Sequence, residues 1–150
     1  MKILVDADAC PVKAIIEDAA QKNNIAVLMF IDTSHQLYSD YSKIITVSKS
    51  SDAVDFALIN QTESGDIVIT GDYGVATMAL AKGAYALHHS GRQYTADNID
   101  QMLLERHISK KQRKTGHYHG HIKKRTAKDN MNFQKSLEAL LEKTGAITHS

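Results

Sequence analysis

Short apolar runs alternate with helix-like stretches along most of the chain, and this alternation restricts the possible folds more than any other feature. Each run is continuously apolar over a few residues, which is typical of a strand that is buried on both faces. Strands that alternate with helices form a parallel sheet with right-handed crossovers and helices on both sides. We therefore predict a three-layer α/β fold whose parallel sheet has four to five strands. The strands are predicted at residues 2–6, 25–31, 44–47, 67–70 and 84–87.

The segments between these runs carry apolar residues at helical spacing. The first is a predicted helix from Pro11, a residue suited to the first helical turn, with apolar residues at i, i+3, i+4 and i+7 from Val12 to Ala19. Residues 32–42 are polar and predict a loop. Further helices are predicted at residues 52–60, with Ser51 as N-cap, and at 73–81, where Gly83 ends the helix. Another is predicted at 95–106, with Ile99, Met102 and Leu103 pointing inward. The last is predicted at 131–143, with inward-pointing Phe133, Leu137, Leu140 and Leu141.

The composition indicates one globular domain, residues 1–150, with 43% apolar and 23% charged side chains and enough length to bury a full core. No apolar run is long enough to cross a membrane, and the run after Met1 is too short for a signal peptide. The single cysteine, Cys10, rules out a disulfide within the chain and is expected to be a small buried residue. We therefore expect a cytoplasmic protein without a membrane partner.

Aspartates follow two of the predicted strands and begin one of the predicted helices. Asp6 and Asp8 come at the end of the first strand, and Asp72 follows the fourth. Asp52 and Asp55 are three residues apart, so they share one face of the helix after the third strand. The carboxyl ends of parallel strands meet at one edge of a sheet, where open α/β sheets bind their ligands. We therefore expect these carboxylates to gather at that edge.

Gathered carboxylates repel one another, by about 4 kcal/mol for a pair at 4 Å and an effective dielectric constant of 20. A cation relieves this repulsion, and oxygen ligands favour Mg²⁺ or Mn²⁺. Such an ion activates water and polarises phosphoryl oxygens, which is the chemistry of phosphodiester hydrolysis. A plainer interpretation stays open for single residues: Asp52 would favour a helix dipole, and Asp72 beside Gly71 would be a turn residue.

Several sequence blocks around these aspartates resemble a known family. Residues 6–13 (DADACPVK), 51–55 (SDAVD) and 69–76 (ITGDYGVA) are similar to the uncharacterised bacterial YaiI/YqxD family, as are residues 82–84 and 91–99. That family in turn resembles a branch of the PIN-like domains. The resemblance covers essentially the whole chain and implies a PIN-like α/β fold.

The same resemblance implies Mg²⁺- or Mn²⁺-dependent ribonuclease chemistry and a role for each aspartate. Asp6 and Asp72 would be the metal ligands at the strand ends, and Asp52 or Asp55 the mid-chain acid. Asp8 is an additional candidate that is peculiar to this branch. The resemblance implies a reaction class and no particular substrate.

Residues 106–128 form a basic strip with nine Lys or Arg and no acid, while the rest of the chain holds nine basic residues against 17 acidic ones. We predict a mobile arm or loop there, because the apolar period is lost. Such a strip would bind RNA in a salt-dependent manner, although a solvated loop stays open. Relatives often carry Gly-Pro-Lys where this chain has residues 120–123 (GHIK). The predicted substrate contacts are Lys13, Lys110, Lys111, Arg113, Lys114, Lys123, Lys124 and Arg125.

Histidines supply further candidates. His117, His119 and His121 alternate along the basic strip and would face one side of an extended segment, which suits a transition metal. His88 and His89 follow the fifth predicted strand, and they either reach the acidic edge or have a structural role.

Three functions are compatible with this sequence. The leading hypothesis is a metal-dependent phosphodiesterase that acts on RNA, with a homodimer as an open option. The pair Asp6 and Asp8 also resembles the motif of haloacid-dehalogenase-type phosphatases, in which Asp6 would be the nucleophile and Asp8 the acid/base of a phosphomonoesterase. The third hypothesis is a nucleic-acid-binding or regulatory module with a vestigial metal site, whose function depends on the basic strip.

Overall fold

The computed structural model describes residues 1–50, 52–105 and 124–145. Three predictions lie outside these ranges: Ser51 as a helix N-cap, the His117, His119 and His121 cluster, and most of the basic strip. The structure therefore bears on the sheet, its helices and the acidic edge.

The sheet confirms the predicted α/β class. Its order is β3-β2-β1-β4-β5-β6, and every neighbouring pair is parallel except β5 and β6, which are antiparallel. β6 was not predicted, because a strand of two residues has no detectable period. The strands are β1 (Lys2–Asp6), β2 (Ala26–Asp32), β3 (Lys43–Val47), β4 (Ile67–Ile69), β5 (Tyr85–Leu87) and β6 (Gln93–Tyr94).

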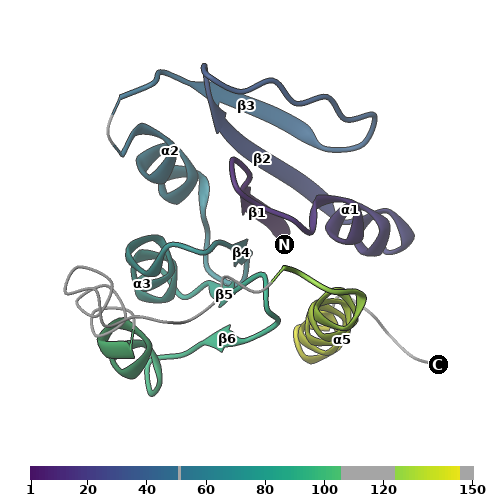
Figure 1. The fold of residues 1–150 in the computed structure, drawn as a ribbon, viewed down its shortest axis with the longest axis vertical. Coiled ribbons are helices and arrows are strands. Elements are labelled where there is room, and N and C mark those ends of the chain that lie inside the picture. The colour runs from purple at the N-terminus through teal and green to yellow at the C-terminus, as the bar shows by residue number, and fades with distance from the viewer. Residues whose placement is uncertain (51, 106–123, 146–150) are drawn as a thin grey trace.

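Helices cover both faces of the sheet, as Figure 1 shows. α1 (Lys13–Lys22) and α5 (Ala127–Lys143) pack on one face, whereas α2 (Ala53–Gln61), α3 (Tyr73–Ala81) and helical residues 99–105 pack on the other. Successive residues of a strand point to opposite faces of the sheet, so they pack into different cores. Ile3 and Val5 belong to the core under α1 and α5, and Leu4 belongs to the opposite core. The architecture has three layers.

The helices differ from the predictions by more than one residue in three boundaries, and in one residue expected to point inward. The helix predicted at 95–106 has its first helical residue at Ile99. α1 begins at Lys13 and not at Pro11, because Val12 has non-helical backbone angles. Leu103 does not point inward and is 40% exposed, although Ile99 and Met102 are buried as expected. α5 begins at Ala127, four residues before the predicted start at 131.

The early start of α5 has a clear local cause. Thr126 and Asp129 form a capping box in which Thr126 Oγ1 accepts from the backbone N–H of Asp129 and the Asp129 carboxylate accepts from the N–H of Thr126. Lys128 therefore belongs to a helix rather than to the predicted arm. Gly91, in the turn between β5 and β6, lies against this helix: a Cβ there would sit 2.8 Å from the backbone oxygen of Asn132.

The amino ends of β1 and β4 are joined by a buried charge pair. Lys2 Nζ lies 2.8 Å from Asp66 Oδ2, and the Asp66 side chain is only 3% exposed. The same carboxylate accepts hydrogen bonds from the backbone N–H groups of Lys2 and Glu63, at 3.0 and 2.8 Å. Burial alone would lower the pKa of Lys2, but the hydrogen bond and charge of Asp66 outweigh it and raise that pKa.

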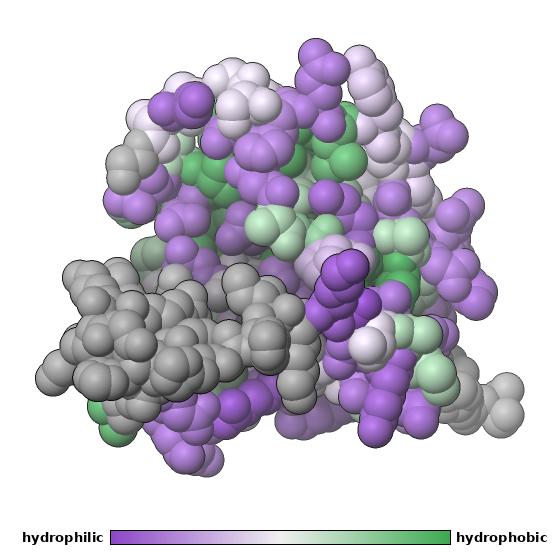
Figure 2. All heavy atoms as spheres, viewed as in Figure 1, coloured by the Kyte–Doolittle hydropathy of each residue, from purple (hydrophilic) through white to green (hydrophobic). Residues whose placement is uncertain are grey.

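The surface view in Figure 2 shows that hydrophilic side chains dominate this face of the molecule, with hydrophobic ones set in patches between them. Within the described ranges, no helix combines the length and the apolar character needed to cross a membrane.

Candidate functional site

The strand order reverses between β1 and β4, and the loops after these two strands are tied together. Thr70, which is buried directly after β4, donates from Oγ1 to Asp6 Oδ2 at 3.0 Å. Thr70 Oγ1 also accepts from the backbone N–H of Asp72 at 3.0 Å. One hydroxyl thus holds the two loops at the position where open α/β sheets form their ligand crevice.

A pocket of about 260 Å³ opens at this position. It gathers three of the predicted site residues, Asp6, Asp8 and Asp72, together with His89 from the end of β5. Ala9 and Gly71 complete its lining, so no basic residue among those the structure describes lines it. The prediction that strand-end aspartates meet at one edge of the sheet is therefore confirmed for these three residues.

Asp72 lines the pocket and also caps a helix. Its Oδ1 accepts from the backbone N–H groups of Gly74 and Val75, at 2.7 and 3.2 Å, and so caps the start of α3. The plainer interpretation expected a turn residue at this position, and the structure shows a helix N-cap. Asp72 also lines the pocket, and within the described residues both of these cap hydrogen bonds go to Oδ1.

Burial raises the pKa of Asp6; the hydrogen bond from Thr70 opposes this shift, and the charges of Asp72 and Asp8 add to it. Asp55, in the first turn of α2, behaves in the same way. Burial and then the charges of Asp72, Asp6 and Asp52 raise its pKa to about 6. Asp55 therefore experiences the field of the pocket, although it does not line it.

Asp52 differs from the other four predicted acids. It occupies the N-cap position of α2 with a φ of 65°, makes no side-chain cap hydrogen bond and is exposed. Its charge contributes to the repulsion that Asp55 experiences. We therefore place it at the rim of the site rather than in it.

Asp32 and His35 are site candidates that the sequence prediction missed. Within the described residues, Asp8, Asp32 and His35 form the only group of three or more Asp, Glu, His or Cys side chains whose ligand atoms all lie within 4.8 Å of one another. Asp6, Asp55 and Asp72 do not form such a group. A signal was present, because Asp32 ends the second apolar run as Asp6 ends the first, but residues 32–42 were interpreted only as a loop.

His89 lines the pocket as a neutral side chain. Burial lowers its pKa to about 4, and the charges of His88 and Arg125 add to this effect. Its Nε2 is buried and has no hydrogen-bond partner within the described structure. His88 is not among the residues that line this pocket, and its Nδ1 lies 2.9 Å from Ser90 Oγ. The alternative that the histidine pair reaches the acidic edge is thus confirmed for His89.

Few of the predicted substrate contacts lie in the described residues. Lys13 opens α1, Lys124 is exposed, and the guanidinium of Arg125 donates to the backbone oxygen of His89 and to Asn130 Oδ1, each at 2.6 Å. Arg125 therefore ties the residues before α5 to the wall of the pocket. Cys10 is buried as predicted, and burial raises the pKa of its thiol.

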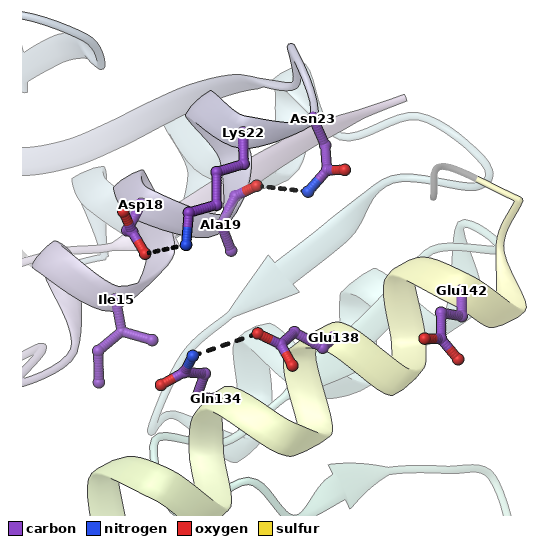
Figure 3. Close-up of a pocket in the computed structure, with 8 residues that line it drawn as sticks. All are labelled: Ile15, Asp18, Ala19, Lys22, Asn23, Gln134, Glu138 and Glu142. Carbon is purple, nitrogen blue, oxygen red and sulfur yellow. Dashed lines mark hydrogen bonds and ion pairs between the residues drawn. The ribbon is translucent and has the colours of Figure 1, made fainter. Parts of the chain in front are cut away.

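A second hollow, of about 300 Å³, lies between α1 and α5 and also carries carboxylates (Figure 3). Its polar groups already have partners: Lys22 pairs with Asp18 at 3.1 Å, and Gln134 donates to Glu138. It is a groove between two helices, far from the strand ends that carry the acidic pocket, and we assign it no chemistry.

The raised pKa of Asp55 predicts a pH-dependent stability. The folded state holds this proton more tightly than the unfolded chain does, so the resulting stabilisation is complete below about pH 4 and is lost as the pH rises through about 6. After allowance for solvent screening, Asp55→Asn should be more stable than wild type by about 1 kcal/mol at pH 8 and equal to it at pH 4. Urea unfolding at both pH values measures this difference. Asp52→Asn is the matched control, and an equal gain for both variants would contradict the assignment.

Fold and pocket together define a three-layer α/β protein with an acidic site where the strand order reverses. The model of the uncharacterised bacterial YaiI/YqxD family matches residues 4–143, and the chain belongs to this family. It is 64% identical to a UPF0178 protein of Lachnoclostridium phytofermentans, over 95% of this chain and 97% of that protein. A UPF0178 protein of Clostridium acetobutylicum is 53% identical, over 94% and 97%. No solved structure matches the chain significantly, so the likeness to PIN-like domains stays a prediction.

Proposed function

We propose that this protein is a Mg²⁺- or Mn²⁺-dependent phosphodiesterase that acts on RNA. The observation that carries the proposal is the pocket itself, in which Asp6, Asp8 and Asp72 meet without a basic residue in the described lining. Uncompensated carboxylates at a strand-order reversal are expected where a divalent cation supplies the missing positive charge.

The residues fit a hard divalent ion. Mg²⁺ keeps several of its waters and needs only one or two carboxylates from the protein, and Asp6 and Asp72, which line the same pocket, can supply them. The raised pKa values of Asp6 and Asp55 both reflect burial together with negative charge nearby, and a cation would relieve the second cause.

Each residue then has a stated role. Asp6 and Asp72 would hold the ion, and Asp8 would hold either the ion or its water. When bound, the ion would polarise a phosphoryl oxygen and increase the acidity of water. Asp55, whose carboxylate feels the charges of Asp72 and Asp6, would accept a proton from that water. Lys13 and the basic strip would contact the RNA backbone.

The test is hydrolysis of a labelled single-stranded RNA by chelator-treated protein with added Mn²⁺ or Mg²⁺. We expect cleavage by wild type and a loss of at least about 100-fold in Asp6→Asn, the size of effect typical of removing transition-state charge stabilisation. Asp18→Asn, from the groove between α1 and α5, is the matched control and should keep full activity. Equal cleavage by Asp6→Asn and wild type would refute the proposal.

The same assay separates the two alternatives. RNA that is bound and not cleaved, with equal affinity for wild type and Asp6→Asn, would support a binding module. Hydrolysis of p-nitrophenyl phosphate without RNA cleavage would support a phosphomonoesterase in which Asp6 is the nucleophile.

A further inference from the structure

We propose that Asp8, Asp32 and His35 form a second divalent-metal site, of the transition-metal type, which adjoins the acidic pocket through Asp8. Metal binding at this site does not depend on the proposed RNA hydrolysis. It is a separate property of the loops that follow β1 and β2.

The fold brings these three residues together by strand pairing. β1 and β2 are parallel neighbours in which Asp6 pairs with Phe30, so their carboxyl ends leave the sheet side by side. Asp32 is the last residue of β2, and Asp8 lies two residues beyond β1. The backbone N–H of His35 donates to the backbone carbonyl oxygen of Asp32 at 3.2 Å, and the backbone N–H of Ser34 donates to Asp32 Oδ1 at 2.8 Å. This turn directs His35 back toward Asp8.

The spacing of the ligand atoms suits a common metal ion. His35 Nδ1 lies 3.1 Å from Asp8 Oδ1 and 3.2 Å from Asp32 Oδ1. Metal–nitrogen and metal–oxygen bonds of about 2.0–2.2 Å at tetrahedral to octahedral angles separate neighbouring ligands by about 3.0–3.5 Å. The two distances from His35 Nδ1 therefore match those between ligands of one ion, and all three ligand atoms lie within 4.8 Å of one another.

The protein leaves this cluster short of positive charge. Asp8 Oδ1 is buried and accepts no hydrogen bond from the residues that the structure describes, although His35 Nδ1 is close. Nδ1 also lies 3.1 Å from Ser34 Oγ, so three oxygens surround a nitrogen that donates at most one proton. In the described ranges, neither Asp8 nor Asp32 forms an ion pair with a lysine or arginine. A buried carboxylate oxygen without a donor is costly, and a cation is the partner that the geometry lacks.

The ligand types distinguish this site from the carboxylate pocket. An imidazole nitrogen with two carboxylates favours Mn²⁺, Co²⁺ or Zn²⁺, whereas Mg²⁺ favours oxygen ligands alone. His35 is half-exposed, so an ion can reach it from solvent and the side chain can be replaced without opening the core.

Titration of chelator-treated protein with Co²⁺, followed by its visible absorption, tests the proposal. The starting protein carries His117→Ala, His119→Ala and His121→Ala, so that the basic strip cannot bind the ion. We expect a saturable absorption band, and a loss of affinity of at least about 10-fold in His35→Ala and in Asp32→Asn. Asp40→Asn, an exposed aspartate of the same loop, is the matched control. Circular dichroism checks that each variant is folded.

Other outcomes distinguish this site from the pocket. Co²⁺ binding that is unchanged in His35→Ala, or no binding at all, would overturn the second site and leave the RNA hydrolysis proposal untouched. Binding that is lost only in Asp72→Asn would assign the ion to the carboxylate pocket alone and would also overturn it.

Discussion

Replacing Asp72 by asparagine is expected to weaken Mn²⁺ binding at the acidic pocket by at least about 10-fold while leaving the fold intact. Asparagine caps helices as well as aspartate does, so the hydrogen bonds to Gly74 and Val75 should survive and the free energy of unfolding should change by less than about 0.5 kcal/mol. The charge that faces the ion is lost. Asp72→Asn therefore separates the ligand role of this residue from its structural role.

Calorimetric titration with Mn²⁺ measures this effect, in protein that lacks His117, His119, His121 and His35 so that the other candidate sites are silent. Asp72→Ala is the control for capping, and it should lose metal affinity together with about 1 kcal/mol of stability. If Asp72→Asn bound Mn²⁺ as tightly as its parent, Asp72 would be a helix cap and nothing more.

Replacing Asp66 by alanine is expected to cost about 3–5 kcal/mol of stability, the usual effect of breaking a buried charge pair from one side. The carboxylate is the shared acceptor of Lys2 Nζ and of two backbone N–H groups, and the side chain is almost fully buried. Its removal deprives the two backbone N–H groups of this acceptor at the amino ends of β1 and β4, and among the described residues it leaves Lys2 Nζ with only the exposed Glu63 as a charge partner. A loss of this size is a large part of the 5–15 kcal/mol that holds a typical domain folded.

Urea denaturation at neutral pH measures the loss, and Glu63→Gln is the matched control. Glu63 also pairs with Lys2 Nζ, at 3.3 Å, but its side chain is 81% exposed, so this variant should lose less than about 1 kcal/mol. If Asp66→Ala and Glu63→Gln lost equal stability, burial of Asp66 would not be the reason why the pair between Lys2 and Asp66 is strong.

Most of the fold was predictable from the sequence, because buried parallel strands are continuous apolar runs. β1 was predicted with its observed bounds, and β2, β3, β4 and β5 to within one residue at either end. The early start of α5 was missed because it depends on a local capping box, and apolar spacing, which guided the prediction, gives no weight to such a cap. Leu103 was misplaced because a helical period does not fix how wide the buried face is.

The candidate site was predictable only where a residue directly follows a strand. Asp6, Asp8 and Asp72 were predicted because the carboxyl ends of parallel strands converge. His35 required knowledge of how the turn after β2 folds back, and no periodicity encodes that turn. The orphaned Nε2 of His89 likewise depends on burial by segments distant in sequence.

The position of α5 has a consequence for the order in which the core can form during synthesis. α2 and α3 lie in the middle of the chain, so the face of the sheet that they cover can close while translation continues. The opposite face is sealed by Phe133, Leu137 and Leu141, which pack on Ile3 and Val5 from the first strand. α1 covers another part of that face and is made early. At about 5–20 residues per second, a nascent chain therefore waits several seconds before α5 covers the rest of that face. The parts of Ile3 and Val5 that α5 covers in the folded protein therefore stay exposed until the last helix of the described structure has been made.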